Sequence, residues 1–114
     1  MSVRLDKWLW AARFYKTRAL AKKAIKGGKV HFQGQKTKVS KTVNIGDIYQ
    51  VQQPHIKKTI VVEALDEVRK SAIEAQKLYI ETNESIEKRQ KEALLKKQQV
   101  YKVMKNQLKN NVDR

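Results

Sequence analysis

The start of the chain places apolar residues at helical spacing. The positions are Leu5, Trp8, Leu9 and Ala12. Steps of three and four residues bring these side chains onto one face, so the pattern predicts an amphipathic helix over residues 3–14.

A second helix is predicted over residues 18–26, with Thr17 as a favourable N-cap. At about 100° per residue, one arc of this helix is apolar and the opposite arc is cationic. The apolar arc holds Leu20, Ala21, Ala24 and Ile25, and the cationic arc holds Arg18, Lys22, Lys23 and Lys26. Gly27-Gly28 should end the helix, because glycine adopts the left-handed conformation without a Cβ penalty.

The next forty residues change to a two-residue period that predicts short strands. Val30 and Phe32 alternate with polar residues and indicate a half-buried strand. Turns are predicted at Gln33-Gly34-Gln35 and at Gly46-Asp47. The strand residues around the second turn are Val43, Ile45, Ile48, Tyr49 and Val51. Another strand is expected over residues 59–65.

The last third of the chain returns to helical patterns. Ser71 and Glu74 form a capping box that predicts a helix over residues 72–81. A long helix should follow from about residue 84 to 110, with a thin apolar stripe. The stripe consists of Ile86, Leu94, Tyr101, Met104 and Leu108. So narrow a stripe predicts a helix that lies on the surface.

Charge divides the chain into three parts around its only proline, Pro54. The formal net charge is +15, far beyond what solubility requires, and this indicates a polyanionic partner. Residues 1–53 carry twelve basic and two acidic side chains, residues 59–87 carry three and seven, and residues 88–114 carry nine and two. We therefore expect a basic module over 1–53, a connecting strand and linker over 54–70 that complete its sheet, and an acidic connector helix with a basic helix over 71–114.

Several classes of site and location are disfavoured by composition. There is no cysteine, and the two histidines, His31 and His55, lie far apart, so we expect neither a metal site nor a cofactor. No apolar run approaches the roughly 18 residues of a membrane span. The first apolar stretch contains Arg4, Asp6 and Lys7, which is unlike a signal peptide. A cytoplasmic protein that avoids membranes is predicted.

The candidate binding residues are eleven of the twelve cations of the first module, together with Thr17. They are Arg4, Arg13, Lys16, Thr17, Arg18, Lys22, Lys23, Lys26, Lys29, Lys36, Lys38 and Lys41. Arg18, Lys22 and Lys26 follow each other at intervals of four, so a phosphate backbone would meet them in succession. Trp8 is expected in the core, whereas Trp10 has two interpretations, packing or base stacking. Asp6 is interpreted as an ion-pair partner that orients an arginine.

The order of these residues resembles the S-four-type RNA-binding domain, also called the alpha-L motif. The resemblance covers residues 3–52 and rests on Arg4 to Leu9, Thr17-Arg18-Ala19, Ile25, Gly28, Val30, Gly34 and Gly46-Asp47-Ile48. It implies an α+β fold in which two helices pack on a small antiparallel sheet, followed here by the C-terminal helices. Residues 4–21 and parts of 71–85 further resemble a family of ribosome-associated heat shock proteins.

This resemblance implies binding of ribosomal RNA on the free large ribosomal subunit while the subunit carries a stalled nascent chain on tRNA. The protein would then help to recycle aborted translation complexes under stress, with peptidyl-tRNA as a further candidate partner, and would be a monomer off the ribosome. The alternatives are a general nucleic-acid binding protein, including weak DNA binding, and an RNA-modification accessory factor. An enzyme is not expected, because residues 54–114 contain no glycine-rich phosphate loop and no clustered carboxylates with a polar companion.

Overall fold

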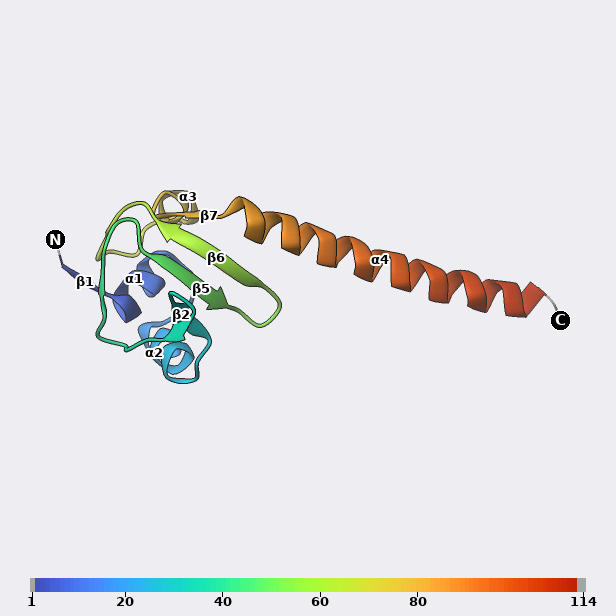
Figure 1. Cartoon of the computed structure of the whole chain (residues 1–114), viewed down its shortest axis with the longest axis horizontal. Helices are drawn as coiled ribbons and strands as arrows, with labels where there is room; N and C mark the ends of the chain where they lie inside the picture. The colour runs from blue at the N-terminus through green and yellow to red at the C-terminus, as the bar shows by residue number, and fades with distance from the viewer. Residues whose placement is uncertain (1, 113–114) are drawn as a thin grey trace.

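The computed structural model describes the backbone of residues 2–112 and the side chains of residues 2–100 and 102–104. A small α+β body carries one long helix that extends away from it, so the molecule measures 68 × 27 × 25 Å (Figure 1). The elements are β1 (Val3–Arg4), α1 (Leu5–Ala11), α2 (Arg18–Lys26), β2 (Val30–Phe32), β3 (Gln35–Lys36), β4 (Thr42–Val43), β5 (Ile48–Gln52), β6 (Lys57–Val62), α3 (Ala72–Gln76), β7 (Tyr79–Glu81) and α4 (Asn83–Val112). The predicted α+β class is confirmed.

The strands form two antiparallel sheets. Five of them pair in the order β3-β2-β5-β6-β7, while β1 and β4 form a separate two-stranded ribbon. Tyr49 and Val51 are buried on β5, and Ile60 and Val62 are buried on β6. Tyr49 lies directly opposite Ile60. This alternation turns one face of the sheet toward the core.

The core lies between that sheet face and the two N-terminal helices, which pack against each other (Figure 1). Trp8 is fully buried, as predicted, and its indole Nε1 donates a hydrogen bond to the carbonyl oxygen of Ala64 at 3.0 Å. The Trp8 ring lies 6.1 Å from that of Phe14 and 6.4 Å from that of Tyr49. The large aromatic side chains therefore form the core itself, which holds α1 on the sheet.

The first predicted helix is shorter than expected at both ends. Residues 3–4 form a strand, because Val3 pairs with Val43 across the two-stranded ribbon. Helix α1 ends at Ala11, and two residues later Arg13 adopts a φ of +64°. Pairing with a strand forty residues away is a non-local interaction, and local apolar spacing does not report it.

The second helix is confirmed from its cap to its last residue. The Thr17 hydroxyl accepts a hydrogen bond from the Leu20 amide at 3.1 Å, and α2 ends at Lys26 before Gly28, whose φ is +75°. The apolar arc is narrower than predicted, because Leu20 is 46% exposed whereas Ala21 and Ile25 are buried.

The strand residues predicted around Gly46 are confirmed except for Ile45, which lies in the turn itself, and the strand predicted beyond them has other bounds. Both predicted turns are present, but β4 pairs with β1 and not with β5, so the Gly46 turn joins two sheets. The strand expected over residues 59–65 is β6, which covers Lys57–Val62.

The helix predicted over residues 72–81 is wrong in its second half. Ser71 does cap the helix, accepting from the Glu74 amide at 3.4 Å, but α3 ends at Gln76. The chain then forms β7, in which Tyr79 pairs with Val62 and packs its ring 4.5 Å from that of Phe14. Sheet pairing and aromatic packing override the local helical pattern here.

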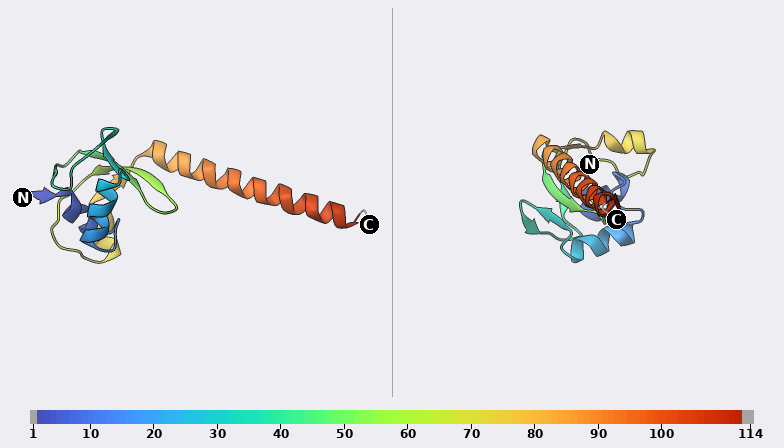
Figure 2. Two further views of the ribbon diagram at one scale, coloured as in Figure 1. Left: turned by 90° about the horizontal axis from the view of Figure 1, so that it is seen from below. Right: turned by 90° about the vertical axis from the view of Figure 1, so that its right-hand side faces the viewer.

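Helix α4 confirms the predicted long C-terminal helix, but the expectation that it lies on the surface of the protein is wrong. It packs on the sheet only through its first turns and then extends away from the body (Figure 2). The stripe residues Leu94 and Met104 are exposed. The side chains of Tyr101 and Leu108, assigned to the same stripe, lie outside the described residues. Among the helices that the structure describes, none is long and apolar enough to cross a membrane.

The turn between β2 and β3 yields a stability prediction. Gln33 and Gly34 have φ angles of +52° and +77°, the pattern of a tight hairpin turn. A Cβ at Gly34 would meet no atom within 4 Å, so the penalty of Gly34→Val is conformational. We expect a loss of about 1–2 kcal/mol in the free energy of unfolding, measured by urea denaturation. Gln35→Val, in the adjoining strand, is the control and should be nearly neutral. Unchanged stability of the Gly34→Val variant would contradict this structural role for Gly34.

Candidate nucleic-acid interface

Helix α2 presents a row of cations to solvent. Lys22, Lys23 and Lys26 are exposed, and Arg18 is partly exposed at the start of the helix. Lys23 and Lys26 lie in the last turn, where positive charge interacts favourably with the carbonyl end of the helix. The helix is therefore stable with its cations displayed, and its exposed face is suited to a polyanion.

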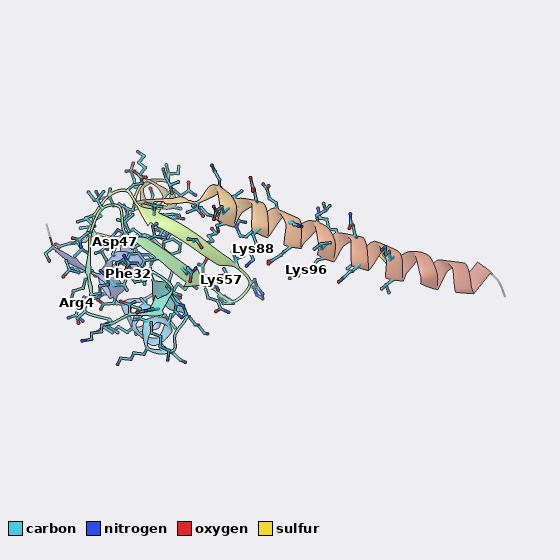
Figure 3. The ribbon with its side chains drawn as sticks, in the orientation of Figure 1. Arg4, Phe32, Asp47, Lys57, Lys88 and Lys96 are labelled. Atoms are coloured by element: carbon cyan, nitrogen blue, oxygen red, sulfur yellow. The ribbon has the colours of Figure 1, made fainter. Side chains whose placement is uncertain are left out.

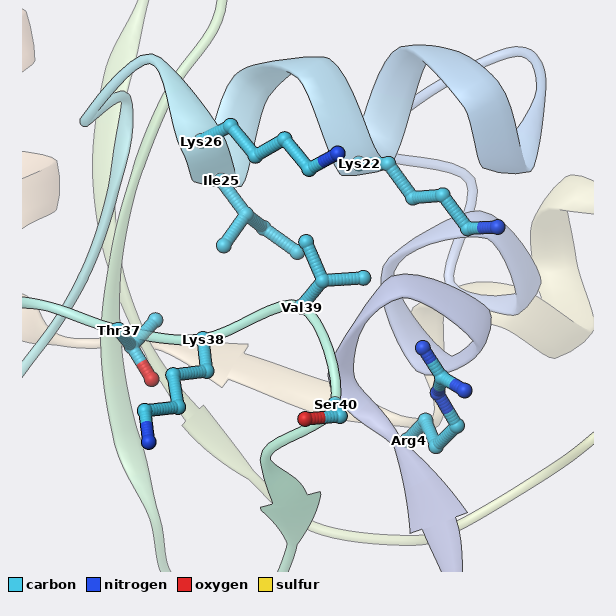
Figure 4. A pocket seen from close by; sticks show the side chains of 8 residues that line it. All are labelled: Arg4, Lys22, Ile25, Lys26, Thr37, Lys38, Val39 and Ser40. Carbon is cyan, nitrogen blue, oxygen red and sulfur yellow. The ribbon is translucent and has the colours of Figure 1, made fainter.

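A groove runs between α2 and the loop that leads into β4 (Figure 4). Its volume is about 450 Å³, and we call it the α2 groove. It is lined by Arg4, Lys22, Ile25, Lys26, Thr37, Lys38, Val39 and Ser40. Figure 4 shows Lys22 and Lys26 on the helix side, Lys38 on the loop side and Arg4 at one end. The groove thus gathers cations that are separated by up to 34 positions in the sequence.

The buried Asp6 carboxylate organises one end of this groove. It accepts from Arg4 Nε at 3.2 Å and from Arg18 Nη2 at 3.0 Å, and its side chain is fully buried. The side chain of Arg4 remains 53% exposed and that of Arg18 40% exposed. Each guanidinium can therefore contact a ligand while Asp6 fixes its orientation. The predicted role of Asp6 as an arginine partner is confirmed, with two arginines in place of one.

The loop side of the groove is fixed by backbone hydrogen bonds to the start of α1. The Leu5 amide donates to the Lys41 carbonyl at 2.8 Å, and the Asp6 amide donates to the Val39 carbonyl at 3.4 Å. The first amides of a helix lack partners within the helix, and the loop satisfies two of them. The same residue, Asp6, therefore positions both the arginines and the loop.

Lys41, a candidate binding residue, is engaged inside the protein. Its ammonium lies 4.0 Å from the centre of the Phe32 ring and 3.5 Å from an oxygen of Asp47, and its side chain is 21% exposed. The same carboxylate accepts the Tyr49 hydroxyl at 3.0 Å; burial, together with this acid, raises the pKa of Tyr49. Lys41 is thus held against the sheet by a cation–π contact and an ion pair.

The remaining candidates surround the α2 groove or lie away from it. Arg13 donates from Nε to the Lys70 carbonyl at 2.7 Å, beyond the end of α1. Thr17 uses its hydroxyl as the cap of α2. Lys36 lies across Gly28, with its Cε 2.8 Å from the position of a Cβ there. The other exposed candidates, outside the groove lining, are Lys16, Lys23 and Lys29.

The half-buried aromatic residues next to α1 are held by hydrogen bonds within the protein. The Tyr15 hydroxyl donates to the Gln52 carbonyl at 3.1 Å, and burial raises the pKa of Tyr15 to about 12. Arg69 donates to the carbonyls of Trp10 and Tyr15 at 3.1 and 2.8 Å. Trp10 packs at the edge of the core, which supports its packing interpretation.

Sequence reasoning missed the uncharged residues of the α2 groove. Thr37 and Ser40 place hydroxyl groups between the cations, and Ile25 and Val39 form an apolar floor. The alternation of lysine with hydroxyl residues over 36–42 is a signal that points to them, since hydroxyl groups donate to phosphate oxygens.

Comparisons with known proteins agree with this architecture. The S4 domain family model matches residues 3–48. Heat shock protein 15 of Escherichia coli strain K12 is 55% identical over 97 residues, which cover 85% of this chain and 73% of that protein. The heat shock protein 15 homolog of Haemophilus influenzae is 52% identical over 95 residues, which cover 83% of this chain and 72% of that protein. The trimeric structure of Vibrio cholerae heat shock protein 15 matches with a TM-score of 0.81 at 54% sequence identity, covering 83% of this chain and 96% of that chain. The resemblance inferred from the sequence is confirmed.

The Asp6 cluster yields a second prediction. Asp6→Asn keeps the shape of the side chain but removes the charge that both arginines face in a buried site. We expect a loss of about 2–3 kcal/mol in the free energy of unfolding, typical of hydrogen bonds to a charged group, in chemical denaturation. Asp66→Asn, which weakens a more exposed pair with Lys70, is the matched control and should lose less than about 1 kcal/mol. Equal losses in the two variants would contradict a special role for Asp6.

Proposed function

This chain belongs to the heat shock protein 15 family, and we propose that it binds structured ribosomal RNA through the α2 groove. The observation that carries this proposal is the convergence of Arg4, Lys22, Lys26 and Lys38 on one groove. Cations that line one groove repel each other, and the phosphates of a nucleic acid relieve that repulsion while releasing counterions.

Contacts to phosphates and to RNA shape should dominate over base reading. Trp8 and Phe14 are buried in the core, and Phe32 lies under the Lys41 ammonium. Within the described residues these rings are unavailable as stacking platforms for bases. Lysine and arginine contacts to the backbone fix the position of a folded RNA, and the Thr37 and Ser40 hydroxyls add hydrogen bonds of the same kind.

We further propose that the RNA belongs to the free large ribosomal subunit that carries a stalled nascent chain on tRNA, and that binding aids recycling of aborted complexes. Membership of the heat shock protein 15 family and the basic α2 groove support this assignment. Sedimentation of a cell extract through a density gradient tests it directly. The protein should travel with free large subunits; its presence only at the top of the gradient would contradict the assignment.

RNA and DNA share the phosphate chemistry that the α2 groove would recognise, so competition is needed to separate them. A structured RNA should displace bound RNA far better than duplex DNA of equal length, because the two helices differ in groove shape and in the 2′-hydroxyl. Equal displacement would favour general nucleic-acid binding.

We also propose a cytoplasmic location and a monomeric state off the ribosome. The solved Vibrio cholerae relative is a trimer, and the mass of the free chain in solution decides between the two states.

The third prediction concerns the lysines of the α2 groove. The triple variant Lys22→Gln, Lys26→Gln, Lys38→Gln removes exposed cations and leaves the Asp6 pairs intact. If each lysine neutralises one phosphate, the slope of log affinity against log salt should fall in magnitude by about 2–3 units, since each contact contributes roughly 0.7–0.9.

The matched control is Lys91→Gln, Lys97→Gln, Lys102→Gln, which removes the same charge from exposed positions of α4. Its slope should change by much less. Affinity is measured by titration of labelled RNA at several salt concentrations, and circular dichroism checks the fold of each variant. Indistinguishable slopes for the two triple variants would contradict the α2 groove as the RNA site.

A further inference from the structure

A second cationic groove lies where α4 leaves the sheet. We propose that it binds the phosphate backbone of a second segment of the same folded RNA, an inference that rests on the proposed function. The groove is bounded by the β5–β6 hairpin on one side and by the first turns of α4 on the other, and we call it the hairpin groove (Figure 3).

The hairpin groove consists of two adjoining hollows of about 220 and 140 Å³. Lys57, Arg89 and Glu92 line both hollows, so the two are continuous. Lys88 lies in one hollow and Lys96 in the other. Eight residues of helix separate these two lysines by about 12 Å along the axis, a length over which a nucleic-acid strand presents several phosphates.

Three lysines supply the free positive charge of the hairpin groove. Lys57, on β6, is exposed, and so are Lys88 and Lys96 on α4. Within the described residues none of the three has a carboxylate within 4.0 Å. Figure 3 places Lys57 on the hairpin, with Lys88 and Lys96 about two turns apart on the neighbouring helix. This arrangement leaves their ammonium groups available to an anion.

Arg89 differs from the three lysines, because its ion pair with Glu81 holds α4 beside the hairpin. Its guanidinium donates to both oxygens of Glu81, at 2.8 and 2.7 Å. The Ser85 hydroxyl donates to Glu81 at 2.6 Å, and its oxygen accepts from the Thr59 amide at 3.0 Å. The bond to Arg89 lowers the pKa of Glu81 and so keeps this carboxylate charged. These bonds set the direction of α4 and therefore the width of the groove.

Glu92 opposes an anion in the hairpin groove. It lies between Lys88 and Lys96 in the sequence at intervals of four, so all three occupy one side of the helix. The lysines outnumber this carboxylate three to one, so the groove stays positive. Glu92 makes the proposal sharply testable, because removal of its charge should strengthen binding.

The two cationic grooves lie on different faces of the molecule. Gln50 and Thr59 line the hairpin groove, whereas Tyr49 and Ile60, their neighbours along the strands, point into the core beneath α1 and α2. Because side chains alternate across a sheet, the hairpin groove is on the opposite face from the helices. A folded ribosomal RNA can reach both faces with two of its segments, which favours a large structured RNA as the ligand of both grooves.

The first test compares Lys57→Gln, Lys88→Gln, Lys96→Gln with the control Lys91→Gln, Lys97→Gln, Lys102→Gln. Each variant loses three charges, and none of the control residues lines the hairpin groove. The probe is purified large-subunit ribosomal RNA, titrated at several salt concentrations. We expect the slope of log affinity against log salt to fall in magnitude by about 1.4–2.7 more for the groove variant than for the control, equivalent to two or three contacts. Equal slopes would overturn the proposal.

The second test changes the carboxylate and leaves every lysine in place. Glu92→Gln should raise the affinity for the same RNA, because it removes a negative charge beside the bound phosphates. Glu87→Gln, an exposed carboxylate on α4 that does not line the groove, is the control. Equal affinities of the two variants would contradict the proposal even if a lysine variant failed to fold.

The two proposals fail in distinguishable ways. If the α2-groove variant loses binding while the hairpin-groove variant behaves like its control, only the hairpin site is rejected. If neither groove variant differs from the control, RNA binding through these cations is rejected as a whole.

Discussion

The buried carboxylate of Asp6 is the interaction on which the proposed binding surface depends. It lies within a strongly basic module without any solvent exposure, and it faces arginines from β1 and from α2. A buried charge is tolerated only when it is paired and hydrogen-bonded. By meeting this requirement, Asp6 joins the N-terminal strand to the second helix, and its own amide ties down the loop on the other side of the α2 groove.

Different sets of side chains form the hydrophobic core and the cationic surface. Large aromatic side chains such as Trp8 and Tyr49 form the core, while the cations of α2 and of the loop after β3 stay at the surface. A second, partly buried network, from Arg89 through Glu81 to Ser85 and Thr59, directs α4. In both places a carboxylate within the body pairs with arginine, and the lysines that line the adjacent groove are exposed.

Much of the α2 side of the interface was predictable because it is local. The Thr17 cap and the Gly28 stop lie within one or two residues of the helix ends, and the cations at intervals of four follow from helix geometry. The interpretation of Asp6 as an arginine partner was confirmed, since an isolated acid among so many bases has few other roles. The helix predicted over residues 72–81 failed because β7 gains sheet partners that lie far away in the sequence.

The sequence by itself determined the α+β class, the bounds of α2, the excess positive charge that indicates an anionic partner, and the resemblance to an RNA-binding module. Each of these depends on residue type or on spacing within a few turns. Tertiary structure alone decided that Arg4 and Lys38 meet Lys22 and Lys26 in one groove, and that Lys41 turns inward over Phe32. The same holds for Lys57 opposite Lys88. These contacts depend on strand pairing and packing between segments that are distant in the sequence, and no local pattern contains those energies.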